Sequence, residues 1–266
     1  MSGLPRSVYY YHISNTPPDR WRVECGLIKK IFHRNKGRYG YRRITSELHN
    51  QGYTINHKTV RKLMHKLGLV CKVRMKKYCS YKGEVGKIAP NLLERNFTSD
   101  RPLRKLVTDV TEFSLFGVKR YLSTVLDLFN GEIVSYTLCE NHALGMVLEM
   151  IRKLLKKVGD GGGAILHSDQ GSQYQSKVYQ EMLRTNGFIQ SMSRRGNCLD
   201  NAAMENFFGL LKSELLYLQD FDSITHFEHE LHEYIRYYNN HRIKSRLGGK
   251  SPVKYRREYE RICARV

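Results

Sequence analysis

The chain has 266 residues, 41% of them apolar, and no stretch approaches the roughly 20 consecutive apolar residues that a membrane helix needs. The start of the chain lacks the apolar core of a signal peptide, and its six cysteines include no CxxC pair. We therefore expect a cytoplasmic protein with reduced thiols, and its net charge of +20 favours a polyanionic partner such as DNA or RNA.

The basic residues are concentrated at the two ends of the chain. Residues 1–104 carry 23 Lys and Arg against 6 Asp and Glu, residues 105–235 carry 12 against 17, and residues 236–266 carry 10 against 2. Basic flanks suit a polyanion that is held on either side of the centre. The acidic centre needs its own explanation, and bound metal cations provide one.

Residues 1–20 are predicted to be irregular, and residues 21–70 to form a helix-turn-helix-like DNA-binding domain. Apolar residues at helical spacing predict a first helix that stops near Gly37 and another over about residues 57–67. The basic side chains of this region are expected to contact DNA: Arg42, Arg43, Lys58, Arg61 and Lys62. The alternative is a solvated basic face on a packing helix.

Residues 71–104 are predicted to be a basic linker that follows a phosphate backbone. From Lys105 the pattern changes to that of an α/β domain. Its predicted elements are strands over residues 106–113, 121–129 and 133–138, with an Asn130-Gly131 hairpin, then a helix (144–158), a strand (164–169), a helix (176–185), a strand (188–192) and a helix (201–218). This order over residues 105–222 is that of a ribonuclease-H-like catalytic core, and residues 223–266 are predicted to be a C-terminal helix and basic tail.

Three acidic residues lie where this fold would bring them together. Asp109 is within the first strand, Asp169 ends the fourth, and Glu205 opens the last helix, with 35 residues between Asp169 and Glu205. Functional groups gather at the carboxyl ends of strands in such sheets. Phosphodiester cleavage needs an activated attacking oxygen and a stabilised leaving oxygen, which divalent cations held by a few carboxylates provide. The three acids are therefore predicted to be catalytic and to bind Mg²⁺, for which Mn²⁺ can substitute.

Each acid also has a structural explanation. Asp109 could be an exposed strand residue, Asp169 could begin a turn, and Glu205 suits the dipole of a first helical turn. In combination with the element order, however, the three favour a metal site. Lys212 lies two helical turns beyond Glu205, so we expect it to share the face of Glu205 and to hold a DNA phosphate. The alternative is an ordinary surface lysine.

The sequence resembles a known family, the transposases of bacterial insertion sequences that are related to retroviral integrases. The chain is similar to the product of that family's second reading frame. The matching motifs span nearly the whole chain: Tyr39-Gly40-Tyr41-Arg42-Arg43-Ile44, Thr108-Asp109-Val110-Thr111, His167-Ser168-Asp169-Gln170-Gly171-Ser172-Gln173-Tyr174, Ser191-Met192-Ser193-Arg194, Gly196-Asn197-Cys198-Leu199-Asp200-Asn201-Ala202 with Glu205, and Tyr238-Asn239 with Arg242, Leu247, Ser251 and Pro252.

The resemblance implies an integrase-type core with an acid triad at Asp109, Asp169 and Glu205. It implies cleavage and joining of double-stranded DNA, both insertion-sequence ends and target, with Arg194 and Arg195 among the expected contacts. It also implies a homo-oligomer on DNA, association with the nucleoid, and a partner encoded by an upstream reading frame and joined by frameshifting. Two alternatives remain open: a metal-dependent nuclease of the same fold without strand transfer, and a non-catalytic DNA-binding regulator.

Overall fold

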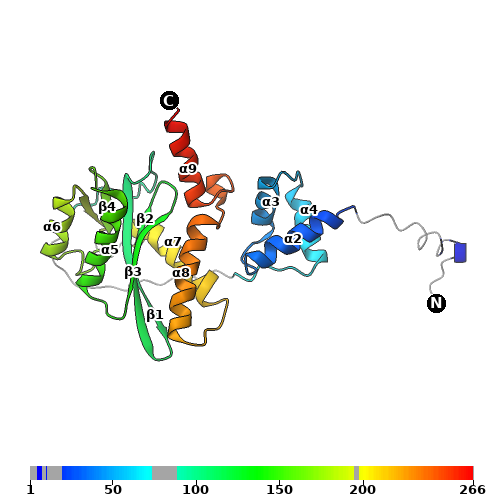
Figure 1. The fold of residues 1–266 in the computed structure, drawn as a ribbon, viewed down its shortest axis with the longest axis horizontal. Helices are drawn as coiled ribbons and strands as arrows, with labels where there is room; N and C mark the ends of the chain where they lie inside the picture. Colours follow the sequence, from blue (N-terminus) through cyan, green and yellow to red (C-terminus); the bar gives the residue numbers. More distant parts are fainter. Residues whose placement is uncertain (1–4, 8–9, 11–19, 74–88, 195–197, 266) are drawn as a thin grey trace. The chain divides into compact units, whose positions relative to one another are not determined.

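The computed structural model describes residues 5–7, 10, 20–73, 89–194 and 198–265, with the backbone alone at residues 198 and 199. The chain divides into two compact units, Met1–Lys72 and Val73–Val266 (Figure 1). Arg195 lies outside the described residues, as do most of the predicted irregular segment and residues 74–88 of the predicted linker. No helix in the described ranges is long and apolar enough to cross a membrane.

Over residues 20–72 the N-terminal unit consists of three helices: α2 (Arg22–Arg34), α3 (Tyr41–Asn50) and α4 (His57–Lys66). Each turns an apolar stripe inward, and the most deeply buried helical side chains are Ile28, Ile31, Ile44, Leu48 and Val60. The Asn56 side chain caps α4 by accepting a hydrogen bond from the amide of Lys58. Gly52, at a φ of +86°, makes the short turn between α3 and α4. The predicted helix-turn-helix outline is thus present.

A five-stranded mixed sheet forms the centre of the C-terminal unit, in the order β3-β2-β1-β4-β5. Its strands are β1 (Lys105–Leu115), β2 (Val118–Asp127), β3 (Ile133–Cys139), β4 (Ile165–Ser168) and β5 (Ile189–Met192). The first three pair as an antiparallel meander, and β4 and β5 extend the sheet in parallel from β1. The predicted Asn130-Gly131 turn joins β2 to β3, with Gly131 at a φ of +72°.

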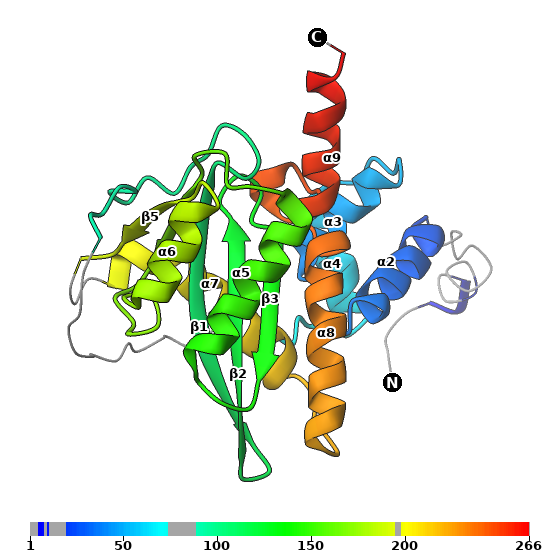
Figure 2. The same cartoon turned by 60° about the vertical axis from the view of Figure 1, so that its left-hand side comes forward.

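Helices cover both faces of this sheet (Figure 2). One face packs against α5 (Leu144–Val158) and α6 (Lys177–Thr185), and the other against α7 (Ala202–Leu211) and α8 (Ile224–Asn240). Because side chains alternate along a strand, Leu106 is buried on the α5 side and Val107 on the α7 side. The predicted ribonuclease-H-like core is therefore confirmed, with its elements in the expected order.

The last predicted helix of the core is interrupted rather than continuous over residues 201–218. A 3-10 turn η1 (Cys198–Asn201) leads into α7, and a π-helical turn η2 (Lys212–Leu216) follows it. The wider π turn brings Glu214 into the core, where both carboxylate oxygens accept hydrogen bonds from the Arg242 guanidinium at 2.7 and 2.8 Å. This buried pair ties the end of α7 to the segment that follows α8.

The C-terminal region contains a second long helix, α9 (Pro252–Cys263), after a 3-10 turn η3 (Ser245–Leu247). The Ser251 side chain caps α9, and Pro252 occupies its first turn. The base of α9 lies against the β2–β3 turn, because the Asn130 side chain donates to the Pro252 carbonyl at 3.0 Å. The residues expected to form a basic tail are therefore largely helical.

Candidate active site

The register of the sheet sets two of the predicted acids side by side. Parallel pairing of β1 with β4 matches Leu106 with Leu166 and Val107 with His167. Two residues further along the same register, Asp169 directly follows β4 at the level of Asp109 on β1. The alternating and apolar patterns that produce the two strands thus also bring the two carboxyl groups together.

Both aspartates are oriented by nearby hydrogen-bond donors. Asp109 accepts from the Val110 amide through Oδ1 at 2.7 Å and from the Asn201 Nδ2 through Oδ2 at 2.9 Å. Asp169 accepts from the Gly171 amide through Oδ1 at 2.9 Å. The donors are neutral, so they orient these carboxylates without cancelling their charge.

The pKa values of all three acids are raised. Burial raises the pKa of Asp109 well above its usual range, the negative charge of Asp169 raises it further, and Glu205 adds a smaller effect of the same sign. Burial also raises the pKa values of Asp169 and Glu205. Partly buried carboxylates that repel one another in this way are stabilised by a divalent cation, whose charge reverses the sign of the local field.

The donor set fits such a cation, although the three side chains do not form a ready-made ligand cluster. In the part of the chain that the structure describes, no three His, Cys, Asp or Glu side chains meet in a metal-binding arrangement. Glu205 is the weaker electrostatic partner of Asp109, behind Asp169. Hard carboxylate oxygens suit Mg²⁺-like ions, which keep several waters and need only a few protein ligands.

Asp200 fixes the segment that carries Asn201, and sequence reasoning did not identify either residue as functional. Asp200 is 1% exposed, and its carboxylate accepts from the backbone and guanidinium of Arg194, from Arg95 and from Asn91. The Arg194 hydrogen bonds hold the pKa of Asp200 well below its usual range, although burial acts in the opposite direction. This network fixes the position of η1, from which Asn201 reaches Asp109.

His167 links β4 to the same network. Its ring is buried, with Nδ1 at 2.8 Å from the Ser191 Oγ and Nε2 at 3.0 Å from the Asp200 carbonyl. Burial lowers the pKa of His167, which favours a neutral ring whose Nε2–H donates to Asp200. Ser191 then donates to Nδ1 and accepts from the Leu92 amide at 2.9 Å. Part of the predicted linker therefore lies against the core.

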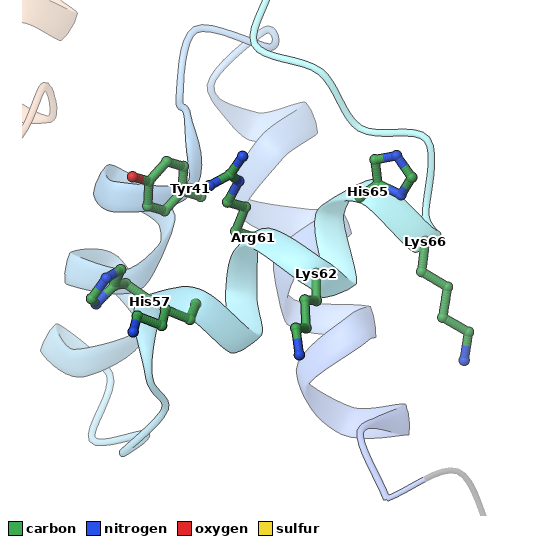
Figure 3. Close-up of a pocket in the computed structure, with 7 residues that line it drawn as sticks. Tyr41, His57, Arg61, Lys62, His65 and Lys66 are labelled. Carbon is green, nitrogen blue, oxygen red and sulfur yellow. The ribbon is translucent and has the colours of Figure 1, made fainter.

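A basic groove of about 580 Å³ lies on the N-terminal unit along α4 (Figure 3). Its lining is cationic and aromatic: Tyr41, His57, Lys58, Arg61, Lys62, His65 and Lys66. The guanidinium of Arg61 lies 6.0 Å from the centre of the Tyr41 ring, and that of Arg42 lies 5.7 Å from it. Four of the predicted DNA contacts, namely Arg42, Lys58, Arg61 and Lys62, therefore lie in or beside one groove that suits a polyanion.

The remaining predicted contacts have other neighbours. Arg43 lies over the buried ring of Tyr39 at 5.5 Å, and Arg194 is paired with Asp200. The Lys212 ammonium lies 5.8 Å from the centre of the Phe113 ring, and burial lowers its pKa, against an opposing effect of Glu112. The acid whose charge opposes the fall in the pKa of Lys212 is Glu112.

Comparison with known proteins follows the same division of the chain. An HTH-like domain family matches residues 21–77, and two integrase core domain families match residues 99–198 and 205–259. The InsK protein of insertion sequence element IS150 of Escherichia coli (strain K12) is 49% identical over 96% of this chain and 90% of its own length. An uncharacterized transposase-like protein of Haemophilus influenzae is 50% identical over 76% of this chain and 93% of its own length.

The transposase for insertion sequence element IS904 of Lactococcus lactis is 38% identical over 88% of this chain and 95% of its own length. These relatives favour neither of the alternatives, a simple nuclease or a non-catalytic regulator. The chain therefore belongs to the insertion-sequence transposases of the DDE type, enzymes of DNA transposition that bind DNA and depend on divalent metal.

Proposed function

We propose that Asp109, Asp169 and Glu205 are the metal-binding and catalytic acids of this transposase. The observation that carries the proposal is the parallel register of β1 and β4, which sets Asp109 beside Asp169, and the charges of Asp169 and Glu205 both raise the pKa of Asp109. A charge cluster of this kind is costly in a folded core unless it serves a cation. Mg²⁺ is the proposed ion, with Mn²⁺ as a substitute, because the ligands are few, hard and carboxylate.

The bound ions supply charge stabilisation for the attacking and leaving oxygens of a DNA phosphodiester. The chain's own residues orient the ligands. The amides of Val110 and Gly171 and the side chain of Asn201 each donate to one carboxylate oxygen of Asp109 or Asp169. Oriented in this way, the acids support cleavage at the ends of an insertion sequence and transfer of those ends to target DNA.

The groove along α4 is the proposed DNA surface of the N-terminal unit, with Arg42, Lys58, Arg61 and Lys62 as contacts. Arg43, Arg194, Arg195 and Lys212 were also predicted to touch DNA. The contacts of Arg43, Arg194 and Lys212 with Tyr39, Asp200 and Phe113 support a structural contribution for these three.

The proposed partners are double-stranded DNA of the element ends and target, a second copy of this chain on DNA, and the product of the upstream reading frame, fused by frameshifting. Two element ends must be held together for joining, which favours an oligomer. The proposed organisation is an irregular segment (1–20), a DNA-binding domain (21–70), a basic linker (71–104), the catalytic core (105–222) and a C-terminal region (223–266). We also propose a cytoplasmic, nucleoid-associated protein, as its charge of +20 suggests.

Thermal stability with and without Mg²⁺ tests the acid assignment without requiring an active complex. Metal that binds only the folded chain raises its melting temperature. We expect this rise in the wild type and in the control Asp160→Asn, which replaces an exposed acid of the same unit. It should be lost in Asp109→Asn and Asp169→Asn, together with activity. A metal-dependent rise in Asp109→Asn equal to that of the wild type would overturn the assignment.

A further inference from the structure

The acidic side chains of α9 are paired with cations, and most of the remaining cations of the helix share one face. Its two acidic side chains toward the C-terminal end, Glu258 and Glu260, bind Lys250 and Arg256 respectively, and Arg256 also pairs with Glu132 at 2.8 Å. Four other cations are exposed, and no ion pair within the described residues involves them: Lys254, Arg257, Arg261 and Arg265. Their spacing of three, four and four residues sets them on one face of the helix and of the turn that directly follows it.

The base of α9 is anchored, whereas its outer half projects from the unit (Figures 1 and 2). The Phe129 ring packs on Tyr255 and Tyr259, with ring centres 5.4 and 4.9 Å apart. Beyond these contacts residues 260–265 are exposed, and Ile262 is 64% exposed. A helix of this length gains little from propensity alone, so an outer half without packing partners in the fold favours a role at an interface.

The helix dipole does not account for the stripe. Cations near a helix C-terminus are stabilising, which suits Arg261 and Arg265. Lys254 lies in the first turn, however, where a positive charge is unfavourable, and Arg257 lies in the middle, where the dipole has little effect. Residues 105–235 carry an excess of acids, so the cations are not spread evenly for solubility either.

We propose that α9 is a second DNA-binding surface, on which Lys254, Arg257, Arg261 and Arg265 follow the sugar–phosphate backbone of duplex DNA. At about 1.5 Å per helical residue the stripe is about 16 Å long, which equals about five base-pair steps of 3.4 Å. Basic side chains that contact phosphates bind without reading sequence. A second copy of the stripe would repel the first, so duplex DNA is the occupant that its charge favours.

The proposal is tested by the salt dependence of binding to a short duplex of arbitrary sequence, measured by fluorescence anisotropy. Each phosphate contact contributes about 0.9 to the slope of log affinity against log salt concentration. Arg257→Gln/Arg261→Gln should therefore lower the slope by up to about 1.8. The matched control Lys153→Gln/Lys156→Gln removes two exposed cations from α5 and should leave the slope unchanged. The variant Arg257→Lys/Arg261→Lys keeps both positive charges and should retain most of the wild-type slope.

Three results would overturn the proposal. An unchanged slope in the α9 variant would show that DNA does not bind this surface. An equal fall in the α5 control would show an effect of net charge alone. A change in oligomeric state by sedimentation, without a change in slope, would assign α9 to a protein interface. Because all the substituted side chains are exposed, circular dichroism should show an intact fold, and the acid assignment stands or falls separately, by metal binding.

Discussion

Replacing Arg242 by Met should strongly destabilise the C-terminal unit while leaving the N-terminal unit unchanged. Arg242 and Glu214 have side chains only 3% and 1% exposed, and the two hydrogen bonds between them are joined by a third, from the Tyr234 hydroxyl at 3.1 Å. Removal of the guanidinium takes from this buried carboxylate the cation with which it is paired. Breaking a buried pair in this way costs about 3–5 kcal/mol.

The assay is urea unfolding followed by two probes. Trp21 is the chain's one tryptophan and lies in the N-terminal unit, so its fluorescence follows that unit. Far-ultraviolet circular dichroism follows both units. At about 1–3 kcal/mol per molar urea, the loss corresponds to a fall of at least about 1 M in the midpoint of the C-terminal unit. The control Arg236→Met breaks an exposed pair with Glu233 and should cost under about 1 kcal/mol.

A double variant separates buried charge from lost packing. Glu214→Leu/Arg242→Met removes both charges of the pair, and hydrophobic replacement of a buried pair is often neutral or stabilising. We therefore expect the double variant to recover at least half of the stability that the single variant loses. If it were no more stable than Arg242→Met alone, the loss would come from packing, and the reasoning about an uncompensated carboxylate would be wrong.

Three further predictions concern the proposed metal site and the groove along α4. Asn201→Ala removes a donor to Asp109 and should weaken Mg²⁺ binding by about 10- to 100-fold in a calorimetric titration; unchanged affinity would exclude this orienting role. Burial raises the pKa of Asp109, and metal binds only the deprotonated carboxylate, so Mg²⁺ affinity should be complete above the raised pKa. On acidification the affinity should fall before the pH reaches the usual carboxylate pKa of about 4. An affinity that stayed constant down to that pH would contradict the prediction. Arg61→Ala/Lys62→Ala should lower DNA affinity and its salt dependence while Mg²⁺ binding stays normal; wild-type affinity for element ends would argue against the groove on α4.

Local patterns were sufficient to predict the strands and therefore the pair of aspartates. The β-branched residues around Asp109 and the apolar run before Asp169 specify strands, and parallel pairing then aligns the two acids. Asn201 and Asp200 lie inside one of the family motifs, but their functions depend on partners far away in the sequence. Asn201 donates to a residue 92 positions earlier, and Asp200 binds Arg95, 105 positions earlier. Periodicity carries no information about such contacts.

The break in the last core helix could not be predicted for the same reason. The sequence from Asn201 to Leu218 has no Pro, and its one glycine, Gly209, lies within α7. The π turn depends on Glu214 reaching Arg242, a contact across 28 positions. The expected shared face of Glu205 and Lys212 remains a prediction: α7 is regular from Ala202 to Leu211, and Lys212, directly after it, lies over Phe113.

The most direct test of the central claim is to map the DNA products that this chain forms with the ends of its own element. The chain, alone and fused to the upstream product, is incubated with end DNA, target DNA and Mg²⁺. The account predicts element ends joined to target DNA by at least one form with wild-type acids, and no joined product from the same form carrying Asp109→Asn. Joined products from Asp109→Asn, or cut but never joined ends from both wild-type forms, would contradict it.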